Sequence, residues 1–332
     1  MDVVIRGDGV AAYCCAYLLN KAGLHVALEY ANRPRLPTIM LGEQALGLIR
    51  DVFGQPGILQ NLPRIGKRVV AWGPAAKPIS MQHSAVVVSE QDLLAAIRPS
   101  LIAEHHPTNE ARCQVFAARP LPAQSIEHCF GSRMASAVPV TLKDGSDSQA
   151  CRIESLDDGW LFLIPNSARS GWLLAIAEAS KALLSQSRVV APEIADYGPS
   201  FGEFPASPRI AEPLCGPAWL ACGPAAMGFD PICGDGTAHA IREAILASAV
   251  IRALANGGPQ NDLLQHYEAR LAGAFQQHLA ICRGFYQSGG VTTFWRSELD
   301  AIDRGIQWCD VKPRDRLRFR YRLRGFELEA VR

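Results

Sequence analysis

The chain opens with Met1-Asp-Val-Val-Ile-Arg-Gly7-Asp8-Gly9-Val10-Ala11-Ala12, and this stretch decides the fold. Val3 to Ile5 form a short continuous apolar run, which is typical of a buried parallel strand. Gly7 and Gly9 follow, and they let the backbone turn sharply with no Cβ between it and a bound phosphate. Ala12 supplies the small residue that close packing of a helix on a strand requires. The stretch therefore predicts a strand, a tight turn and the start of a helix.

The next residues complete a βαβ unit. A helix is predicted over 10–22, closed by Gly23, and a second strand over 24–28. Glu29 follows about 20 residues after the glycines, where an acid binds the ribose hydroxyls of a dinucleotide. The alternative is a structural glycine turn in another α/β fold. For a dinucleotide we expect the ribose at Glu29 and the diphosphate at Gly7, Gly9, Val10, Ala11 and Ala12.

A second glycine-rich turn lies far along the chain, in Gly228-Phe-Asp230-Pro231-Ile-Cys-Gly234-Asp235-Gly236-Thr237-Ala238. It precedes a helix predicted over 237–256. The first amides of that helix and the positive end of its dipole would face an anionic group. We expect this turn to bind the other end of the same cofactor, through Asp230, Pro231, Gly234, Asp235, Gly236 and Thr237.

Composition excludes several classes of partner. The 332 residues carry a formal net charge of +1, so bulk charge predicts neither nucleic-acid nor membrane binding. No apolar run is long enough to cross a bilayer and the first residues do not form a signal peptide, so a cytoplasmic protein is expected. The ten cysteines are irregularly spaced and lack histidines at ligand spacing. We therefore expect reduced cysteines and no metal site.

Further motifs resemble those of the tryptophan-halogenase-like flavin-dependent monooxygenases. Leu36-Pro37-Thr-Ile39-Met-Leu-Gly42-Glu43-Gln44-Ala45 is similar to their P-x-I-G-x-G-E-A loop. Gly159-Trp160-Leu-Phe-Leu-Ile-Pro165 resembles their G-W-x-W-x-I-P motif, and the second glycine turn resembles their D-P-x-x-x-x-G-x-x-x-A motif. Gly223-Pro224-Ala-Ala226 stands where the family has G-D-A-A. Pro224 is the clearest departure, because the family's Asp contacts the ribityl chain.

The resemblance implies FAD as the cofactor and adds Gly42, Gln44 and Gly223 to the residues that bind it. It implies an α/β fold, with a Rossmann-like FAD-binding domain of the glutathione-reductase type and an inserted β-sheet-rich substrate domain. We place the FAD-binding domain at 1–60, 85–120 and 212–304, and the substrate domain at 61–84 and 121–211. A basic C-terminal tail is expected over 305–332. A loop is expected over 99–112, where His105 and His106 are not expected to bind a metal.

Three residues are candidates for catalysis. The family places an essential Lys ahead of a strand that ends in Trp, and the strand predicted over 64–72 ends in Trp72. Counting back from Trp72 puts that position at Arg64, with Lys67 close by. The alternative is that both cations are ordinary surface residues. Trp160 is expected between the flavin pocket and the substrate pocket, or as apolar filling between a sheet and the other domain.

The resemblance implies an oxidoreductase, an FAD-dependent monooxygenase that hydroxylates an electron-rich aromatic ring through a flavin C4a-hydroperoxide. The substrate would be an aromatic small molecule such as indole, or a Trp side chain in a partner protein, because some relatives modify Trp during tryptophylquinone maturation. No second glycine-rich βαβ unit is visible. We therefore expect a separate flavin reductase or an NAD(P)H donor.

Three alternatives remain open at this point. A flavin-dependent halogenase is disfavoured by Asp235, which lies near the family's halide position. Two negative charges about 4 Å apart repel by roughly 4 kcal/mol at an effective dielectric constant of 20. A flavin dehydrogenase or oxidase is the second alternative, and a non-catalytic FAD-binding maturation protein is the third.

Overall fold

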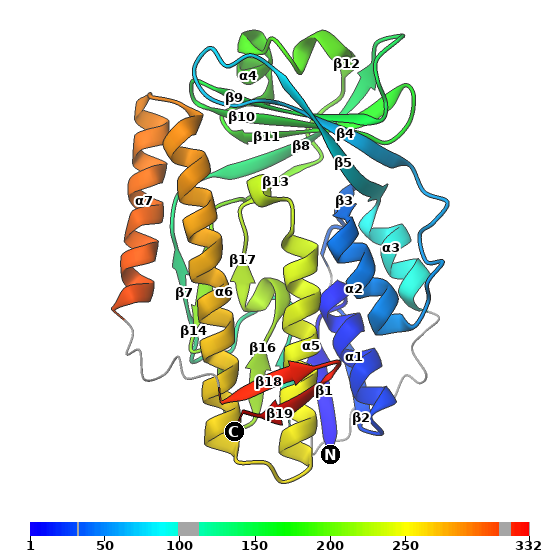
Figure 1. Cartoon of the computed structure of the whole chain (residues 1–332), viewed down its shortest axis with the longest axis vertical. Helices are drawn as coiled ribbons and strands as arrows, with labels where there is room; N and C mark the ends of the chain where they lie inside the picture. Colours follow the sequence, from blue (N-terminus) through cyan, green and yellow to red (C-terminus); the bar gives the residue numbers. More distant parts are fainter. Residues whose placement is uncertain (32, 99–112, 312–319, 332) are drawn as a thin grey trace.

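The computed structural model describes residues 1–31, 33–98, 113–311 and 320–331 (Figure 1). The loop expected over 99–112, with His105 and His106, lies outside these ranges. Seven α-helices occur in the described residues, together with short 3-10 turns. The helices are α1 (Val10–Lys21), α2 (Glu43–Phe53), α3 (Glu90–Ile97), α4 (Ser180–Gln186), α5 (Gly236–Ala255), α6 (Gln260–Gly289) and α7 (Thr293–Asp310), and the 3-10 turns are η2 (Ala191–Glu193), η3 (Gly223–Ala225) and η4 (Pro231–Cys233).

The first sheet contains the predicted βαβ unit. Strand β1 lies between β2 and β6 and pairs in parallel with both, so that Val3 is opposite Val26 and Cys113. Neighbours on both sides explain why β1 is a continuous apolar run. Helix α1 packs against α5, where Ser248 donates a hydrogen bond to Cys15 at 3.3 Å. The order of strands is β15 (Cys215–Gly216), β16 (Trp219–Ala221), β6 (Cys113–Phe116), β1 (Asp2–Arg6) and β2 (His25–Glu29).

The second sheet is larger and mostly antiparallel, and in Figure 1 it lies at the other end of the molecule from β1 and β2. Strand β10 runs near its middle, and its alternate side chains point to opposite faces. Leu161 and Leu163 pack with Leu183 of α4, whereas Trp160 and Phe162 face the main core. The order is β12 (Ile194–Tyr197), β8 (Met134–Leu142), β11 (Ser170–Ala177), β10 (Gly159–Pro165), β9 (Ala150–Leu156), β4 (Arg64–Ala71), β5 (Ile79–Val88) and β3 (Ile39–Gly42), and β13 (Gly202–Pro205) pairs with β8.

Helices α6 and α7 connect the two ends of the molecule. They pack on each other, and Figure 1 shows both running from beside the first sheet towards the second. A small sheet of β17 (Met227–Gly228), β14 (Arg209–Glu212) and β7 (Ile126–Cys129) lies between the two large sheets in that view. A C-terminal hairpin of β18 (Tyr321–Arg324) and β19 (Glu327–Ala330) packs on α5, where Arg252 pairs with Glu327 at 2.7 Å.

The predicted α/β fold class is confirmed, but two predicted boundaries fall inside elements and part of the predicted tail is folded. The boundary at residue 85 lies within β5, which pairs with β3 and extends the second sheet. The boundary at 305 lies within α7, because its buried face continues through Ile302 to Cys309 at helical spacing. Residues 321–330 of the expected tail form the hairpin on α5. No helix in the described ranges is long and apolar enough to cross a membrane.

Candidate functional site

The turn between β1 and α1 has the geometry that phosphate binding requires. Gly7 has a φ of +132°, and a Cβ there would lie 3.0–3.1 Å from Ala117 and Ala118, so only glycine fits. Gly9 directly precedes α1, and no side chain of the described residues caps that helix. Its first turn also contains no acidic residue. The first amides of α1, at Val10, Ala11 and Ala12, therefore form a site suited to an anion.

Two arginines that the sequence analysis missed lie beside this turn. Arg33 pairs with Glu90, with Nη1 and Oε2 2.9 Å apart, and a Cβ on Gly9 would lie 3.2 Å from Arg33 Nη2. Arg35 pairs with the buried Asp8 and also donates to its carbonyl oxygen at 3.1 Å. Guanidinium groups match phosphate oxygens in geometry and charge. The turn thus has two cations as well as helix amides.

The structure brings Glu29 to the same turn. The amide of Gly7 donates to the carbonyl oxygen of Glu29 at 2.8 Å. The Glu29 carboxylate is half-exposed and lies 3.0 Å from Nε of Arg6. Gly42 directly precedes α2, and Gln44 is exposed in the first turn of that helix. Gly42 is the last residue of β3 in the second sheet, and α2, which carries Gln44, packs against α1 and α5.

The second predicted turn is held by its own aspartate. Asp230 caps η4, where its Oδ1 accepts from the amide of Ile232 at 2.9 Å. Pro231 opens that turn and Gly234 ends it in the left-handed region, with a φ of +67°. Gly236 and Thr237 begin α5, a helix of 20 residues whose N-terminus no described side chain caps. This second helix start is also suited to negative charge.

Asp235 lies between the turn and α5 and forms an ion pair with His239, with Oδ2 and Nε2 3.0 Å apart. Burial opposes ionisation of this carboxyl, but the hydrogen bond and charge of His239 outweigh it and lower the pKa of Asp235 below its usual value. Asp235 is therefore an anion at neutral pH. The negative charge that the sequence analysis placed at this turn is present, with a histidine beside it.

Gly223 contacts both α1 and α5. A Cβ at this position, where φ is +57°, would lie 2.8 Å from the Cβ of Ala11 at the start of α1. The amide of Gly223 donates to Glu243 of α5 at 2.7 Å. Two helix starts without side-chain caps therefore lie on one connected framework, with two arginines at the first. This donor set fits FAD, whose diphosphate and flavin ring both need amide donors or cations.

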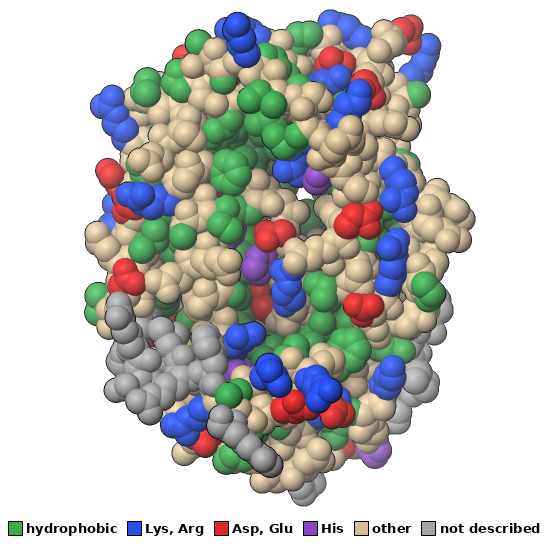
Figure 2. Space-filling model, in the orientation of Figure 1, with side chains coloured by type: hydrophobic (Ala, Val, Ile, Leu, Met, Phe, Trp, Pro, Cys, Tyr) green, Lys and Arg blue, Asp and Glu red, His purple; other side chains and the backbone are tan. Residues whose placement is uncertain are grey.

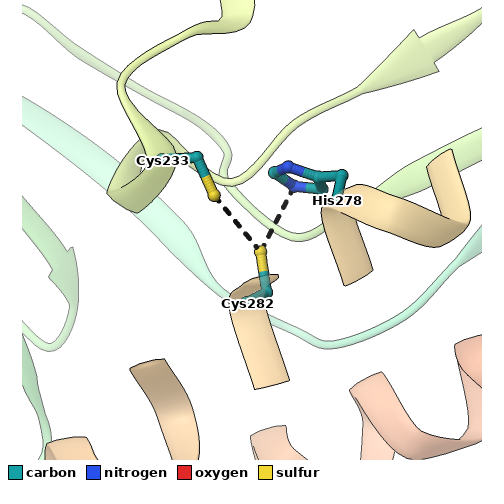
Figure 3. Close-up of side chains that lie close together, drawn as sticks. All are labelled: Cys233, His278 and Cys282. Atoms are coloured by element: carbon teal, nitrogen blue, oxygen red, sulfur yellow. Dashed lines mark hydrogen bonds between the residues drawn. The ribbon is translucent and has the colours of Figure 1, made fainter. Parts of the chain in front are cut away.

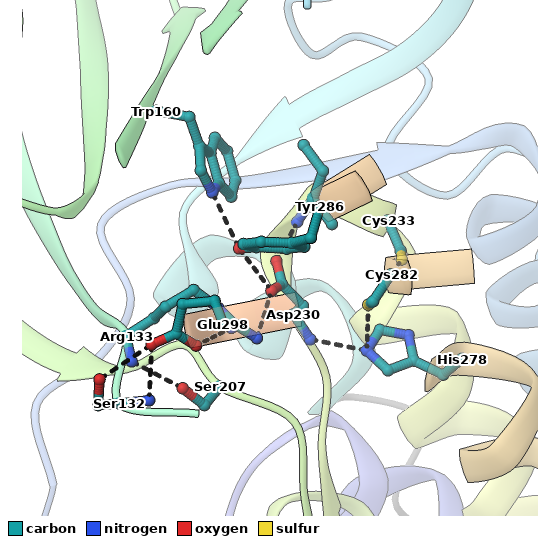
Figure 4. A network of polar contacts seen from close by, with 11 residues as sticks. Ser132, Arg133, Trp160, Ser207, Asp230, Cys233, His278, Cys282, Tyr286 and Glu298 are labelled. Atoms are coloured by element: carbon teal, nitrogen blue, oxygen red, sulfur yellow. Dashed lines mark hydrogen bonds and ion pairs between the residues drawn. The ribbon is translucent and has the colours of Figure 1, made fainter. Parts of the chain in front are cut away.

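A buried polar network surrounds the second turn (Figure 4). Arg133 is fully buried between two carboxylates: it pairs with Glu298, and its Nη2 lies 3.0 Å from Oδ2 of Asp230. The Tyr286 ring lies 4.3 Å from the Arg133 guanidinium, and its hydroxyl donates to Asp230 at 2.9 Å. Trp160 donates from Nε1 to the same hydroxyl at 3.2 Å. The candidate Trp160 is thus linked to Asp230 of the turn.

Burial and charge have opposite effects on the pKa of Asp230 in this network. Burial raises the pKa of Asp230, and the charge of Arg133 opposes that rise.

Trp160 also packs edge-on against Trp72, at 6.0 Å between ring centroids, and Trp72 packs against Trp295 at 5.5 Å. Trp160 therefore connects the second turn to an aromatic cluster at the second sheet.

The other two catalytic candidates, Arg64 and Lys67, do not join Trp160. Both are exposed on β4, where Arg64 lies 3.6 Å from Glu43 and Lys67 lies 2.7 Å from Asp147. The cation of β4 that faces the second turn is Arg68, since a Cβ on Gly234 would lie 3.8 Å from its Nη2.

Arg68 is accompanied by a histidine, because its Nη2 lies 3.2 Å from Nε2 of His83 on β5. Burial, helped by the charge of Arg68, lowers the pKa of His83. Figure 2 shows a hollow in this face of the molecule, with blue and purple side chains at its edge and hydrophobic ones around it. Sequence reasoning missed Arg68 and His83, and their only signal was their place on the two strands before α3.

His278 of α6 supports the second turn from behind and makes the protein sensitive to acid. Its Nε2 accepts from the amide of Asp230 at 2.9 Å, and burial lowers the pKa of the imidazole from 6.5 to about 4. A histidine whose pKa is lower in the folded state stabilises the fold above the unfolded pKa, and this stability is lost as the pH falls from 6.5 towards 4.

We expect the free energy of unfolding of the metal-free protein to fall by about 2 kcal/mol between pH 7.5 and pH 5 because of His278. Urea unfolding at the two pH values measures the loss. The His278→Gln variant keeps an acceptor for the Asp230 amide and cannot titrate, so its stability should change by about 2 kcal/mol less than that of the parent. Equal losses in both proteins would contradict the assignment.

No protein-family model and no curated protein matches the sequence. Solved structures do resemble it. The flavin-dependent halogenase CmlS superposes with a TM-score of 0.72 and 17% identity, over 95% of this chain and 71% of that one. The peptidyl tryptophan dihydroxylase QhpG, essential for tryptophylquinone cofactor biogenesis, has a TM-score of 0.70 and 19% identity, over 99% and 86% of the two chains.

A salicylate hydroxylase in complex with substrate is also similar, with a TM-score of 0.63 and 12% identity over 93% of this chain and 94% of that one. The chain thus has the fold shared by a flavin-dependent halogenase, a peptidyl tryptophan dihydroxylase and a salicylate hydroxylase. This confirms the fold expected from the resemblance.

Proposed function

We propose that the chain is an FAD-dependent monooxygenase that hydroxylates an electron-rich aromatic ring. We propose an indole as its substrate, and we favour the Trp side chain of a partner polypeptide. The observation that carries the proposal is the arrangement of α1 and α5. Their starts carry no side-chain cap from the described residues, the two helices pack on each other, and Gly223 contacts Ala11 at the start of α1 and Glu243 of α5. An elongated cofactor with a diphosphate near its middle and a polar ring at one end suits that arrangement.

Each turn has a separate task in this proposal. The amides of Val10, Ala11 and Ala12 would bind the diphosphate, with Arg33 and Arg35 neutralising its charge and Glu29 accepting from the ribose hydroxyls. At the second turn, the amides of Gly236 and Thr237 would stabilise negative charge on the flavin ring. Reduced FAD supplies the reaction with dioxygen that produces an electrophilic oxygen.

The surrounding residues would position the substrate and hold charge. Arg68 lies at the second turn beside His83 and offers a fixed cation there. Tyr286 and Arg133 hold Asp230 and thereby fix the backbone of the turn. Trp160, through Tyr286, ties that turn to the aromatic cluster of Trp72 and Trp295, which excludes water on that side.

An indole side chain is the favoured substrate for two reasons. One similar structure, which covers 99% of this chain, is a peptidyl tryptophan dihydroxylase. The hollow in Figure 2 has hydrophobic side chains around it, which suits a flat apolar ring. Hydroxylation is favoured over halogenation because the Asp235 carboxylate is held ionised at the second turn and would repel a halide. A separate flavin reductase or NAD(P)H would supply the electrons.

The test is a turnover assay with isotopically labelled dioxygen. Purified chain, FAD, NADH and a separate flavin reductase are incubated with indole, free tryptophan or a Trp-containing peptide. The mass of the product is then measured by mass spectrometry. The proposal predicts one or more labelled oxygen atoms in the indole ring. Hydrogen peroxide formed together with a dehydrogenated substrate that carries no labelled oxygen would indicate an oxidase, and chlorinated product in the presence of chloride would indicate a halogenase. Either result would overturn hydroxylation.

The same assay distinguishes the cations of β4. Replacing Arg68 by Met should slow product formation by about 10²–10³-fold, the usual cost of removing one fixed electrostatic group at a reacting centre. Arg64→Met and Lys67→Met are matched controls on the same strand, and each removes only a half-exposed surface ion pair. A larger loss in either control than in Arg68→Met would return the catalytic role to the residues that the sequence indicated.

A further inference from the structure

Three soft metal ligands meet behind the second turn (Figure 3). Cys233 is the last residue of η4, and His278 and Cys282 lie one helical turn apart on α6. Their Sγ and imidazole nitrogen atoms all lie within 4.8 Å of one another. His278 and Cys282 are buried, whereas Cys233 is half-buried. The hydroxylation proposed above gives no task to either thiol.

Two of the three distances between these atoms match those of a tetrahedral metal site. The two Sγ atoms lie 3.8 Å apart, and Cys282 Sγ lies 3.3 Å from Nε2 of His278. Zinc–sulfur bonds of about 2.3 Å at tetrahedral angles place two thiolates about 3.8 Å apart, and a thiolate and an imidazole nitrogen about 3.6 Å apart. The two Sγ atoms are therefore separated by nearly twice the length of a disulfide bond, which is roughly 2.05 Å. The three side chains would therefore need to move only a little to bind a metal ion.

The arrangement of the ligands along the chain is also suitable. Residues four apart on a helix project from the same face, which is how paired ligands on a helix reach one metal ion. The third ligand comes from a separate segment, so an ion would join η4 to α6. Two cysteines and one histidine select zinc over magnesium or calcium, which prefer oxygen ligands.

We propose that Cys233, His278 and Cys282 bind one Zn²⁺ ion, with its fourth position open on the half-buried side at Cys233. His278 Nε2 now accepts from the amide of Asp230, so coordination exchanges that hydrogen bond for a metal bond. Zinc at this site would therefore act directly on the backbone of the second turn. The inference does not depend on FAD, and it departs from the sequence expectation that no metal site is present.

The test is titration of reduced, flavin-free full-length chain with Co²⁺, followed by displacement with Zn²⁺. The proposal predicts one Co²⁺ per chain, with the intense visible bands of a tetrahedral ion and sulfur-to-cobalt charge transfer, all removed by one equivalent of Zn²⁺. Cys233→Ser and Cys282→Ser should each weaken Zn²⁺ binding by more than about 100-fold, because even outer-shell partners of metal ligands are worth roughly 10–100-fold.

Cys129→Ser is the matched control, since this exposed free cysteine on β7 lies outside the set and its loss should leave binding unchanged. Cys233 is half-buried in a short turn, so its serine variant keeps the test decisive if Cys282→Ser does not fold. Absence of Co²⁺ binding, equal binding by Cys233→Ser and the parent, or isolation of the chain with a Cys233–Cys282 disulfide that resists reduction would each overturn the proposal.

Discussion

Gly9→Asp is expected to weaken FAD binding by about 10³-fold while leaving the fold intact. The new carboxylate would stand directly before α1, where the diphosphate is proposed to bind. Two negative charges about 4 Å apart cost roughly 4 kcal/mol at an effective dielectric constant of 20. The φ of Gly9 is −91°, which any residue adopts, and the nearest atom to a new Cβ is the flexible end of Arg33. Asp is also a good residue to precede a helix, so stability should change by only a few tenths of a kcal/mol.

Ala179→Asp is the matched control. Ala179 is exposed and directly precedes α4, the helix that packs on the second sheet. The variant therefore adds the same charge at a helix start remote from β1. Titration of FAD into each protein, followed by fluorescence, gives the affinities, and urea unfolding gives the stabilities. Parent-like FAD affinity in Gly9→Asp would mean that the diphosphate binds elsewhere.

Arg133→Met should cost about 3–5 kcal/mol of unfolding free energy, the largest loss expected of any single change in the polar network. The variant leaves the carboxylates of Asp230 and Glu298 buried without their shared cation. It also removes the cation that packs on Tyr286 at 4.3 Å. Met fills much of the same volume, so the loss reports uncompensated charge more than an empty space. Urea unfolding at neutral pH measures it.

Two comparisons separate charge from packing in this prediction. Arg169→Met breaks a surface pair with Asp144 whose partners are 76% and 81% exposed, and it should change stability by no more than about 0.5 kcal/mol. Adding Asp230→Asn and Glu298→Gln to Arg133→Met removes both orphaned charges and should recover a large part of the loss. No recovery in this triple variant would show that packing of the arginine, and not its charge, holds the network.

Both glycine turns were predictable because their signals are local. A buried strand, two glycines and a helix of small residues follow one another within Met1 to Lys21, and each element depends on its neighbours in sequence. Glu29 was predictable for the same reason, since the length of α1 and of β2 sets where an acid returns to the turn. The second turn, from Asp230 to Thr237, likewise has its cap, its left-handed glycine and its helix within a few residues.

Counting along the strand indicated Arg64 and Lys67, whereas the cation of β4 that faces the second turn is Arg68. The register between β4 and β5 shifts between Ile65 and Lys67, so the alternation of inward and outward side chains is broken there. Arg64 and Lys67 consequently both lie at the surface, and Arg68 faces Gly234. A count back from Trp72 assumes regular alternation, and no local sequence signal marks the irregularity apart from Gly66.

The long-range contacts had no signal in a single sequence. Arg133 meets Glu298 from 165 residues away, and Arg33 meets Glu90 from 57 residues away. Which carboxylate an arginine meets depends on the packing of α7 and α3, and charge patterns do not fix that. The His278–Cys282 pair is different, because its i,i+4 spacing was readable in the sequence, although the sequence analysis found no histidine at ligand spacing. The missing third ligand, Cys233, comes from a distant turn.

A crystal structure of the chain grown with FAD would show directly where the cofactor binds. We expect one FAD per chain, with its diphosphate against the amides of Val10 to Ala12 and its flavin ring against Gly234 to Thr237. FAD bound with its ends at other places, or a chain that takes up no FAD from a large excess in solution, would contradict this expectation.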